Sequence, residues 1–525
     1  MSENGESACT AGASLAVMST APATAIPEPR VCEQARRSRD ARFDGLFFTA
    51  VHSTRIYCRP VCPAPYARRV SYYASAAAAE AAGYRPCLRC RPELAPGDGS
   101  WRRGDAALAR ALKLIDQGTL ADVPLARLAA GVGVGERQLR RLFVERLGAP
   151  PIGVHGTRRL LFAKQLLTET AMPVTEVAMA AGFGSLRRFN TTFKAAYRMA
   201  PRDLRRQPGA ATHAPGAPLS LRLGYRPPYD FTAMLHFLRG RAVPGVEIVD
   251  TGSYARVVAG EGNAPAGWLR VSAAPAGGHA LRLELHPALA PRLLDIVTRL
   301  RRMFDLDADP GAIAPVLADD PRLAPLLAEH PGLRLPGGWD GFEIAVRAIL
   351  GQQVSVAAAR TLATRIASRH GLPLAAADAL PGLTHLFPAA AALAEADLTD
   401  IGLTGARAAT VRGMAQALLD GAIDFRVDRT LDDSVARWTA VPGIGPWTAQ
   451  YIAMRALGHP DAFPAGDLVL QRAVPADGGR LSARALAARA EAWRPWRAYA
   501  VIHLWREAAA PASTAPAPRA TRSTP

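Results

Sequence analysis

Four cysteines near the start of the chain have the spacing of metal ligands. They follow the pattern Cys58-x3-Cys62, a gap of 24 residues, and then Cys87-x2-Cys90. Thiolates in two short pairs of this kind typically hold one Zn2+ in a closed tetrahedral site. We therefore expect a single zinc ion bound by these four side chains.

A second group of residues that could do chemistry lies near the other end of the chain. The run VPGIGPWTAQY contains a tight Gly443-x-Gly445 turn, with Pro446 where a new helix would begin. Glycines let the backbone approach a phosphate, and the free N–H groups at a helix start bind anions. An acidic residue, Asp467, follows 24 positions after Gly443. Alone, the turn is a weak signal, because any tight connection between helices could supply it.

The charge of the chain indicates a polyanionic partner. Its 525 residues carry 63 Lys and Arg against 45 Asp and Glu, a formal net charge of +18. Residues 101–210 hold 19 of these basic residues and only 8 acidic ones. Such a concentration favours nucleic acid over a membrane surface. No stretch approaches the roughly 18–20 apolar residues that would span a bilayer.

Composition shifts divide the chain into about four domains, close to the number its length predicts. We expect an α+β multidomain protein with a small four-cysteine zinc domain, an all-α basic domain, an α+β domain and an all-α C-terminal domain. The expected boundaries are a disordered tail over 1–29, domains over 30–98 and 100–206, a linker over 207–219, domains over 220–335 and 336–507, and a disordered tail over 508–525. Cys9 and Cys32 lie outside the four-cysteine pattern, and we expect them to be free thiols.

The basic domain contains an internal repeat at an offset of 51 residues. The sequence AAGVG at 129–133 matches AAGFG at 180–184, and each copy stands between an apolar and a basic helical stretch. Two ordinary helical hairpins would give this pattern, but two copies in the most basic segment favour helix-turn-helix units. The segment resembles the AraC-type DNA-binding domain, and this implies DNA contacts by Arg137, Arg140, Arg187 and Arg188.

The zinc cluster resembles a methyl-accepting domain. The runs FDGLFFTAVHSTRIYCRPVCPAPYARRV and AAGYRPCLRCRPE are similar to the N-terminal domain of the Ada family. The resemblance implies that Cys58 takes a methyl group from a DNA methylphosphotriester, once per molecule. Methyl transfer to this cysteine is chemically reasonable. Zinc keeps the thiol deprotonated, and a methylated triester is neutral, so the anionic site does not repel it. A purely structural zinc site remains the alternative.

The C-terminal half resembles AlkA-type 3-methyladenine DNA glycosylases of the helix-hairpin-helix/GPD superfamily. Supporting segments are GYRPPYDFTAMLHFLRGRAVPGVE, GLRLPGGWDGFEIAVRAILGQQVSVAAA and AWRPWRAYAVIHLW. The resemblance implies an AlkA N-terminal-like α+β domain followed by the glycosylase domain. It assigns catalysis to Asp467, base extrusion to a wedge at Gln353, phosphate binding to Gly443 and Gly445, and the base pocket to Phe237, Trp447, Tyr451 and Trp505.

Three features bear on the chemistry, the first being that many relatives have Leu at the wedge position, where this chain has the polar Gln353. Superfamily members that also cleave the abasic strand use a lysine just after the hairpin, where this chain has Trp447. A Schiff base cannot form there, so we expect a monofunctional glycosylase. Gly466 and Leu468 flank Asp467 where well-known members have polar or aromatic residues, so the pocket should be less polar.

These observations together predict a protein of the DNA alkylation-damage response. It would combine a zinc methylphosphotriester sensor and transcriptional activator with a base-excision glycosylase for alkylated purines. The alternative is a transcription factor whose C-terminal half binds DNA without turnover. We expect double-stranded DNA and RNA polymerase as partners, no membrane contact, a monomer, and a cytoplasmic, nucleoid-associated location.

Overall fold

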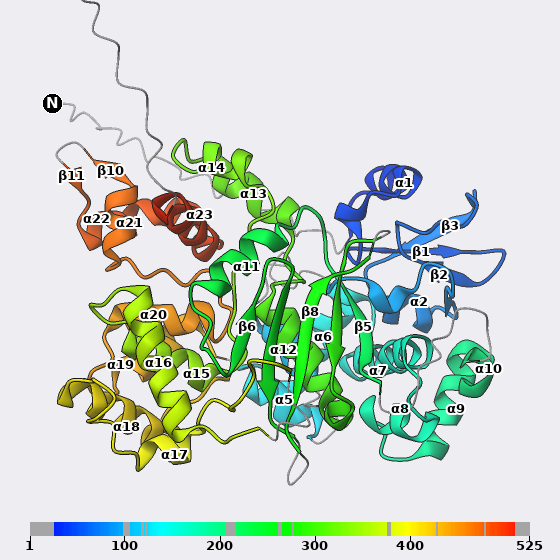
Figure 1. The fold of residues 1–525 in the computed structure, drawn as a ribbon. Coiled ribbons are helices and arrows are strands. Elements are labelled where there is room, and N and C mark those ends of the chain that lie inside the picture. The colour runs from blue at the N-terminus through cyan, green and yellow to red at the C-terminus, as the bar shows by residue number, and fades with distance from the viewer. Residues whose placement is uncertain are drawn as a thin grey trace, which may run out of the picture.

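Figure 1 shows the fold of the chain in a computed structural model. It describes residues 26–97, 106–116, 120, 123–205, 217–260, 265–275, 278–374, 380–426, 429–476 and 479–509. The expected disordered tails and linker, and Cys9, lie largely or wholly outside these residues. None of the helices in the described ranges is long and apolar enough to cross a membrane.

The cysteine-rich segment folds around a four-stranded sheet of strand order β3-β1-β2-β4. Thr49 pairs with Cys58 between the first two strands, so the first cysteine of the cluster ends an internal strand. Buried Phe48 and Tyr57 pack edge to face beneath the sheet. The helices and strands of this part are α1 (Pro29–Ser38), β1 (Phe48–Val51), β2 (Ile56–Cys58), β3 (Val70–Tyr73), α2 (Ala76–Ala81) and β4 (Arg85–Pro86), with 3-10 turns at Ala41–Phe43 and Pro92–Leu94.

The basic domain is all helical. A long helix joins two helix-turn-helix units and buries eleven of its residues, including Leu166 and Leu167. The helices are α3 (Ala106–Asp116), α5 (Leu125–Gly131), α6 (Glu136–Leu147), α7 (Pro151–Glu169), α8 (Val174–Ala180), α9 (Leu186–Tyr197) and α10 (Pro201–Arg205).

The two units are equivalent in space at a different offset from the one expected. The left-handed glycine that ends the first helix is Gly133 in one unit, with φ 79°, and Gly182 in the other, with φ 77°. These residues are 49 positions apart, and the second helices α6 and α9 begin 50 positions apart, so the spatial offset is one to two residues shorter than the 51 of the AAGxG match. A glycine is needed where the helix ends in a left-handed turn, and the two units place it differently within the matched five residues.

The next part contains a five-stranded antiparallel sheet of order β5-β9-β8-β7-β6 within the expected α+β domain. On one face of the sheet, buried leucines such as Leu221, Leu283 and Leu269 pack beneath the helix that follows the sheet. The elements are β5 (Leu219–Gly224), α11 (Phe231–Arg239), β6 (Glu247–Val249), β7 (Ser253–Val258), β8 (Gly267–Ala273), β9 (Ala280–Leu285), a 3-10 turn (Pro287–Arg292), α12 (Leu293–Met303), α13 (Pro310–Ala318) and α14 (Ala324–Glu329).

Within the described residues, the C-terminal part is helical apart from one hairpin, whose two strands have two residues each. Its two cores centre on buried Trp438 and Trp493. The elements are α15 (Gly341–Leu350), α16 (Val356–His370), α17 (Ala390–Ala394), α18 (Gly405–Leu419), α19 (Leu431–Thr439), α20 (Pro446–Arg455), α21 (Leu468–Ala473), β10 (Pro475–Ala476), β11 (Gly479–Arg480), α22 (Ala483–Arg489), a 3-10 turn (Ala490–Trp493) and α23 (Arg497–Ala509).

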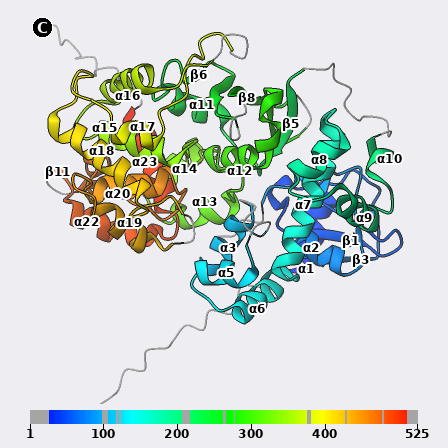
Figure 2. The ribbon, with the colours of Figure 1, turned by 90° about the horizontal axis from the view of Figure 1, so that it is seen from below.

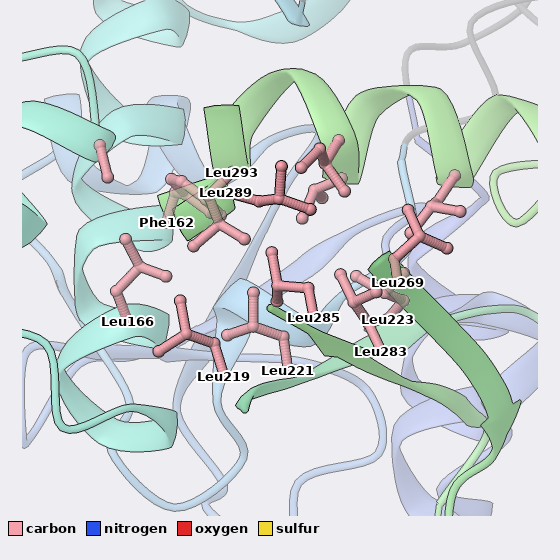
Figure 3. Close-up of a cluster of buried hydrophobic side chains, with 14 of the residues drawn as sticks. Phe162, Leu166, Leu219, Leu221, Leu223, Leu269, Leu283, Leu285, Leu289 and Leu293 are labelled. Carbon is pink, nitrogen blue, oxygen red and sulfur yellow. The ribbon is translucent and has the colours of Figure 1, made fainter. Parts of the chain in front are cut away.

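The domains share cores and buried polar joints. Phe162 and Leu166 of α7 point toward Leu219 and Leu221 of the sheet, so one hydrophobic cluster spans both domains (Figure 3). The sheet domain lies between the zinc and helix-turn-helix parts on one side and the C-terminal helices on the other (Figure 2).

Arg226 joins the zinc domain to the sheet domain. Its side chain is fully buried and donates to the backbone oxygens of Asp44 and Asp307, each over 2.8 Å, and to that of Gly97. Gly97 in turn donates its N–H to the Asp307 carboxylate. The zinc domain and the sheet domain are therefore joined by buried hydrogen bonds.

Candidate active site and metal centre

The hairpin between α19 and α20 has the geometry that the sequence indicates. Gly443 takes φ 86°, and a Cβ there would collide with the Thr410 side chain of α18. Gly445 precedes the first turn of α20, and Pro446 occupies that turn. Ile444 is buried between the two exposed glycines. The turn is thus anchored from below, while its backbone and the start of α20 are accessible to a phosphate.

Asp467 caps α21 and also lies against two tryptophans. Its Oδ1 accepts the N–H groups of Val469 and Leu470, over 2.9 and 3.1 Å. The indole Nε1–H of Trp447 donates to Oδ2 over 3.1 Å, and that of Trp505 to Oδ1 over 3.4 Å. The carboxylate is half-buried. A helix cap and a reactive carboxylate are therefore compatible roles for one side chain here, because the cap uses one oxygen.

A cavity of about 390 Å3 opens beside Asp467, within the usual size range of ligand pockets. Trp447 stacks on Tyr451 with ring centroids 5.4 Å apart and planes at 22°. The ring of Tyr451 lies 6.2 Å from that of Trp505. All three rings line the cavity together with the carboxylate. They offer flat, electron-rich faces beside a fixed negative charge.

Phe237 does not line this cavity. The guanidinium carbons of Arg241 and Arg455 lie 3.8 and 4.7 Å from the centroid of its ring. Cations thus cover the ring, and the cavity wall at this point is Arg241 and Arg455 themselves. The structure brings together three of the four expected pocket aromatics and leaves the fourth behind two arginines.

The end of the cavity near Tyr451 is strongly basic. Arg455 donates to the Tyr451 hydroxyl over 2.9 Å. Burial alone would raise the pKa of Tyr451, but the positive charges of Arg455, Arg241 and Arg347 outweigh it and lower the pKa below its ordinary value. Sequence reasoning missed Arg455, although its position four residues after Tyr451 on one helix face is a usable signal.

A buried ionic cluster joins the sheet to α15, and its residues Glu247, Glu343 and Arg347 line the cavity. Arg256 donates to Glu343 over 2.9 Å, and Arg347 bridges Glu343 and Glu247. Tyr254 donates to Glu247 over 2.7 Å. Two carboxylates and two guanidiniums compensate one another there, so the cluster orients the two domains without adding net charge to the cavity.

Gln353 lies at the tip of the loop between α15 and α16. The residue is exposed and has φ 57°, a left-handed conformation that costs a residue with a Cβ about 1–2 kcal/mol. Its neighbours Gly351 and Val354 line the cavity. The expected wedge residue therefore projects from the rim of the cavity that holds Asp467.

The basic helices expose the arginines that the repeat singled out. Arg137 and Arg140 lie on α6, and Arg187 and Arg188 lie on α9, all with exposed side chains. Arg140 forms an ion pair with Glu136 one turn earlier, over 2.7 Å. Arg137 and Arg187 thus lie at equivalent places near the start of the second helix in each unit.

The four cysteines converge as the spacing predicts. The Sγ atoms of Cys58, Cys62, Cys87 and Cys90 all lie within 4.8 Å of one another. Four thiolates around Zn2+ at about 2.3 Å would stand about 3.8 Å apart, so the cluster fits one tetrahedral zinc ion. Cys62 is the most exposed of the four. Cys32 is buried elsewhere and donates to the backbone oxygen of Pro27.

Arg59, next to Cys58, connects this cluster to the domain joint. The backbone N–H of Arg59 donates to the sulfur of Cys90, with 3.4 Å between nitrogen and sulfur. The guanidinium of Arg59 forms a buried ion pair with Asp44. The backbone oxygen of Asp44 accepts one of the hydrogen bonds that the Arg226 guanidinium donates. Arg59 and Asp44 thus connect the metal centre to Arg226 of the sheet domain.

Comparison with known families matches four segments of the chain. They are the metal binding domain of Ada over residues 31–93, a helix-turn-helix domain over 128–207, the AlkA N-terminal domain over 220–340, and the HhH-GPD superfamily of base excision DNA repair proteins over 346–498. The expected fold class and four-cysteine zinc site are confirmed by these matches together with the cysteine geometry.

Similar proteins cover the same parts. A "DNA-3-methyladenine glycosylase 2" of Escherichia coli is 36% identical over 54% of this chain and 95% of its own length. The "Bifunctional transcriptional activator/DNA repair enzyme Ada" of the same organism is 42% identical over 22% of this chain and 32% of its own length. A "Probable bifunctional transcriptional activator/DNA repair enzyme AlkA" of Mycobacterium tuberculosis is 41% identical over 90% of this chain and 95% of its own length. With all four domains in the same protein and this coverage, the chain belongs to the family of bifunctional AlkA proteins, which unite an Ada-type zinc domain and a helix-turn-helix domain with a DNA glycosylase.

Proposed function

We propose that the C-terminal half hydrolyses the N-glycosidic bond of alkylated purines in duplex DNA. The observation that carries this proposal is Asp467 beside the stacked rings of Trp447 and Tyr451, at a cavity next to the hairpin. A base inside a duplex cannot reach such a cavity, so the damaged nucleotide must leave the helix.

The chemistry follows from the residue types in the cavity. A 3- or 7-alkylated purine is positively charged, and each aromatic face attracts it by roughly 0.5–2 kcal/mol. The cationic base is already a good leaving group, so little acid catalysis is needed. As the bond breaks, positive charge develops on the sugar, and Asp467 stabilises that charge and orients the attacking water. Gly443 and Gly445 hold the backbone phosphate, and Gln353 fills the space that the base leaves.

We propose that the enzyme is monofunctional. The position after the hairpin where lyases carry a lysine is Trp447, and among the described residues lining the cavity there is no lysine. Incubation with lesion-containing DNA and borohydride tests this: we expect no covalent complex. A trapped complex that maps to the cavity would show that strand cleavage also occurs.

We further propose that the zinc domain accepts a methyl group on Cys58. Zinc bound by the four cysteines would keep the sulfur in the nucleophilic thiolate form. The S–CH3 bond forms as the CH3–O bond of the methylphosphotriester breaks, and the electron pair leaves on an ordinary phosphodiester. One negative charge is removed from a surface that faces DNA phosphates, so DNA affinity rises. The reaction occurs once per molecule.

Peptide mapping after exposure to methylphosphotriester DNA tests the acceptor. We expect one added methyl group at Cys58, located by fragmentation of the peptide that also contains Cys62, which is the more exposed of the two. Cys58→Ser should abolish methyl uptake, with zinc content measured separately. Methyl uptake by Cys58→Ser would show that another residue is the acceptor, and a zinc-loaded wild type that takes up none would leave a structural zinc site as the better account.

As partners we propose promoter DNA for the helix-turn-helix domain and RNA polymerase for the methylated protein, with the protein acting as a cytoplasmic, nucleoid-associated monomer. The domain boundaries of 30–98, 100–206, 220–335 and 336–507 are proposed on the same grounds. In-vitro transcription with methylated and unmethylated protein tests the activator role. Light scattering of the full chain tests the monomer.

A further inference from the structure

Gln352 ties together three elements around the cavity, two through its side chain and one through its backbone oxygen. Its amide nitrogen donates to the backbone oxygen of Gly443 and to the hydroxyl of Thr448, each over 3.0 Å. Its own backbone oxygen accepts a hydrogen bond from the Arg407 guanidinium of α18 over 2.8 Å. The loop between α15 and α16 is therefore fixed to the hairpin turn, to α20 and to α18 through one residue.

These contacts support the strained residue next in the chain. Gln353 adopts its left-handed conformation at an exposed position, with no packing around its side chain to hold it. Such conformations persist where the surrounding structure over-determines them. The three hydrogen bonds at Gln352 supply that constraint on the N-terminal side of Gln353. On the C-terminal side, Ser355 caps α16 by accepting the N–H of Ala358.

The same contacts set the distance between two groups that must touch DNA together. Gly443 belongs to the turn that receives a phosphate, and Gln353 projects from the cavity rim formed by Gly351 and Val354. A phosphate held at the turn fixes the register of the duplex. The entry point of the wedge is then correct only while the loop keeps its place relative to that turn.

We propose that Gln352 is a positioning residue for base extrusion, which holds the wedge at Gln353 in register with the phosphate bound at Gly443. It does not contact the reacting atoms. The inference rests on the proposed glycosylase function, since it assigns a role within that reaction. A misplacement of about 1 Å costs up to about 100-fold in rate, so loss of the clamp should be visible in the opening step.

The test uses the full-length protein and a duplex with 2-aminopurine beside the alkylated base, whose fluorescence rises when the duplex opens. We expect Gln352→Ala to slow opening and base release from the duplex by about 10- to 100-fold. Release from single-stranded DNA, which needs no wedge, should change less than about 3-fold. Gln352→Glu keeps the shape of the side chain but cannot donate to Gly443, so it should behave like Gln352→Ala.

A matched control is Gln416→Ala on α18, which removes an amide that donates to Asp420 on the exposed surface. It should leave both reactions unchanged. The effect of Gln352→Ala should also largely disappear in a Gln353→Gly background, because nothing is then left to position. Persistence of the full effect in that background would contradict the proposal.

Two other results would overturn the inference. One is wild-type opening by Gln352→Ala, and the other is an equal loss on single-stranded and duplex DNA, which is the mark of a general structural role. The glycosylase proposal fails separately: a wild type that opens the duplex but releases no base would refute it, while the fluorescence step would still test Gln352.

Discussion

The indole nitrogen of Trp447 donates to Oδ2 of Asp467 across 3.1 Å, so one of the rings that line the cavity also holds the carboxylate. Trp505 makes the corresponding contact with Oδ1 over a longer 3.4 Å. Hydrogen bonds to the charged form of a carboxylate stabilise that form and fix its direction. Hydrogen bonds thus join the rings of Trp447 and Trp505 to the carboxylate of Asp467.

Removing only the N–H of Trp447 should therefore slow the reaction while the stacking surface remains. A hydrogen bond to a charged group is worth about 1.5–3 kcal/mol, so Trp447→Phe should lower single-turnover base release by about 10- to 100-fold. Trp505→Phe, which removes the longer bond, should have the smaller effect. Equal rates for wild type and Trp447→Phe would show that the indole does not orient Asp467.

Arg226 should be essential to the union of the zinc and sheet domains. Its guanidinium is fully buried and holds the backbone oxygens of Asp44, Gly97 and Asp307. We expect Arg226→Ala to lower the free energy of unfolding by about 3–5 kcal/mol, as measured by urea denaturation.

The control for this prediction is Arg222→Ala. The Arg222 side chain is 45% exposed and pairs with Glu169, so its loss should cost less than about 1 kcal/mol. Similar values for the two variants would mean that the joint around Arg226 contributes little to stability.

The free energy of unfolding should fall in mild acid because His503 is buried in its neutral form. Burial lowers the pKa of His503 from 6.5 to about 4, since the charged form is excluded from the core. Between these values the unfolded chain binds a proton that the folded protein does not. The contribution of His503 is therefore complete above pH 6.5 and is lost as the pH falls toward 4, by at most about 1.4 kcal/mol per unit.

Urea denaturation at neutral pH and near pH 5 measures this effect. His503→Gln should show a shallower loss of stability than wild type over that range. His52→Gln, a change at an exposed histidine, should follow wild type. An unchanged slope in His503→Gln would contradict the assignment.

The exposed arginines of α6 and α9 should contribute to DNA affinity through phosphate contacts. Replacement of Arg137 or Arg187 by Ala should weaken binding and reduce the slope of log affinity against log salt by about 0.9 for each phosphate that is no longer neutralised. Arg140, which is paired with Glu136, should have the smaller effect. Fluorescence anisotropy across a salt series gives these slopes, and slopes equal to that of wild type would place the DNA elsewhere.

Local sequence patterns predicted what lies within one element or one turn. The convergence of Cys58 with Cys90 follows from zinc-ligand spacing, and the hairpin at Gly443 follows from its turn residues. The repeat was recognised, but its spatial offset was not, because a short match does not show which glycine turns left-handed.

Contacts between distant segments were not predictable in this way. Arg226 meets Asp44 across 182 positions, and Gln352 meets Gly443 across 91. The two arginines over Phe237 come from α20 and from the turn after α11. Each of these pairings depends on how whole domains pack, and no periodicity or composition within one segment carries that information.

The central claim is that Asp467 does the chemistry, and one comparison tests it most directly. Wild type and Asp467→Asn are mixed in excess with duplex DNA that contains 3-methyladenine, and the free base is measured over time. The single amide oxygen can still cap α21 through Val469 and Leu470, but the side chain loses the second acceptor that faces Trp447 and carries no charge. We predict that it releases base at least about 100-fold more slowly while binding the duplex as wild type does. Equal catalytic rates would show that Asp467 does not do the chemistry, and equal background release by both would leave a DNA-binding regulator in place of the enzyme.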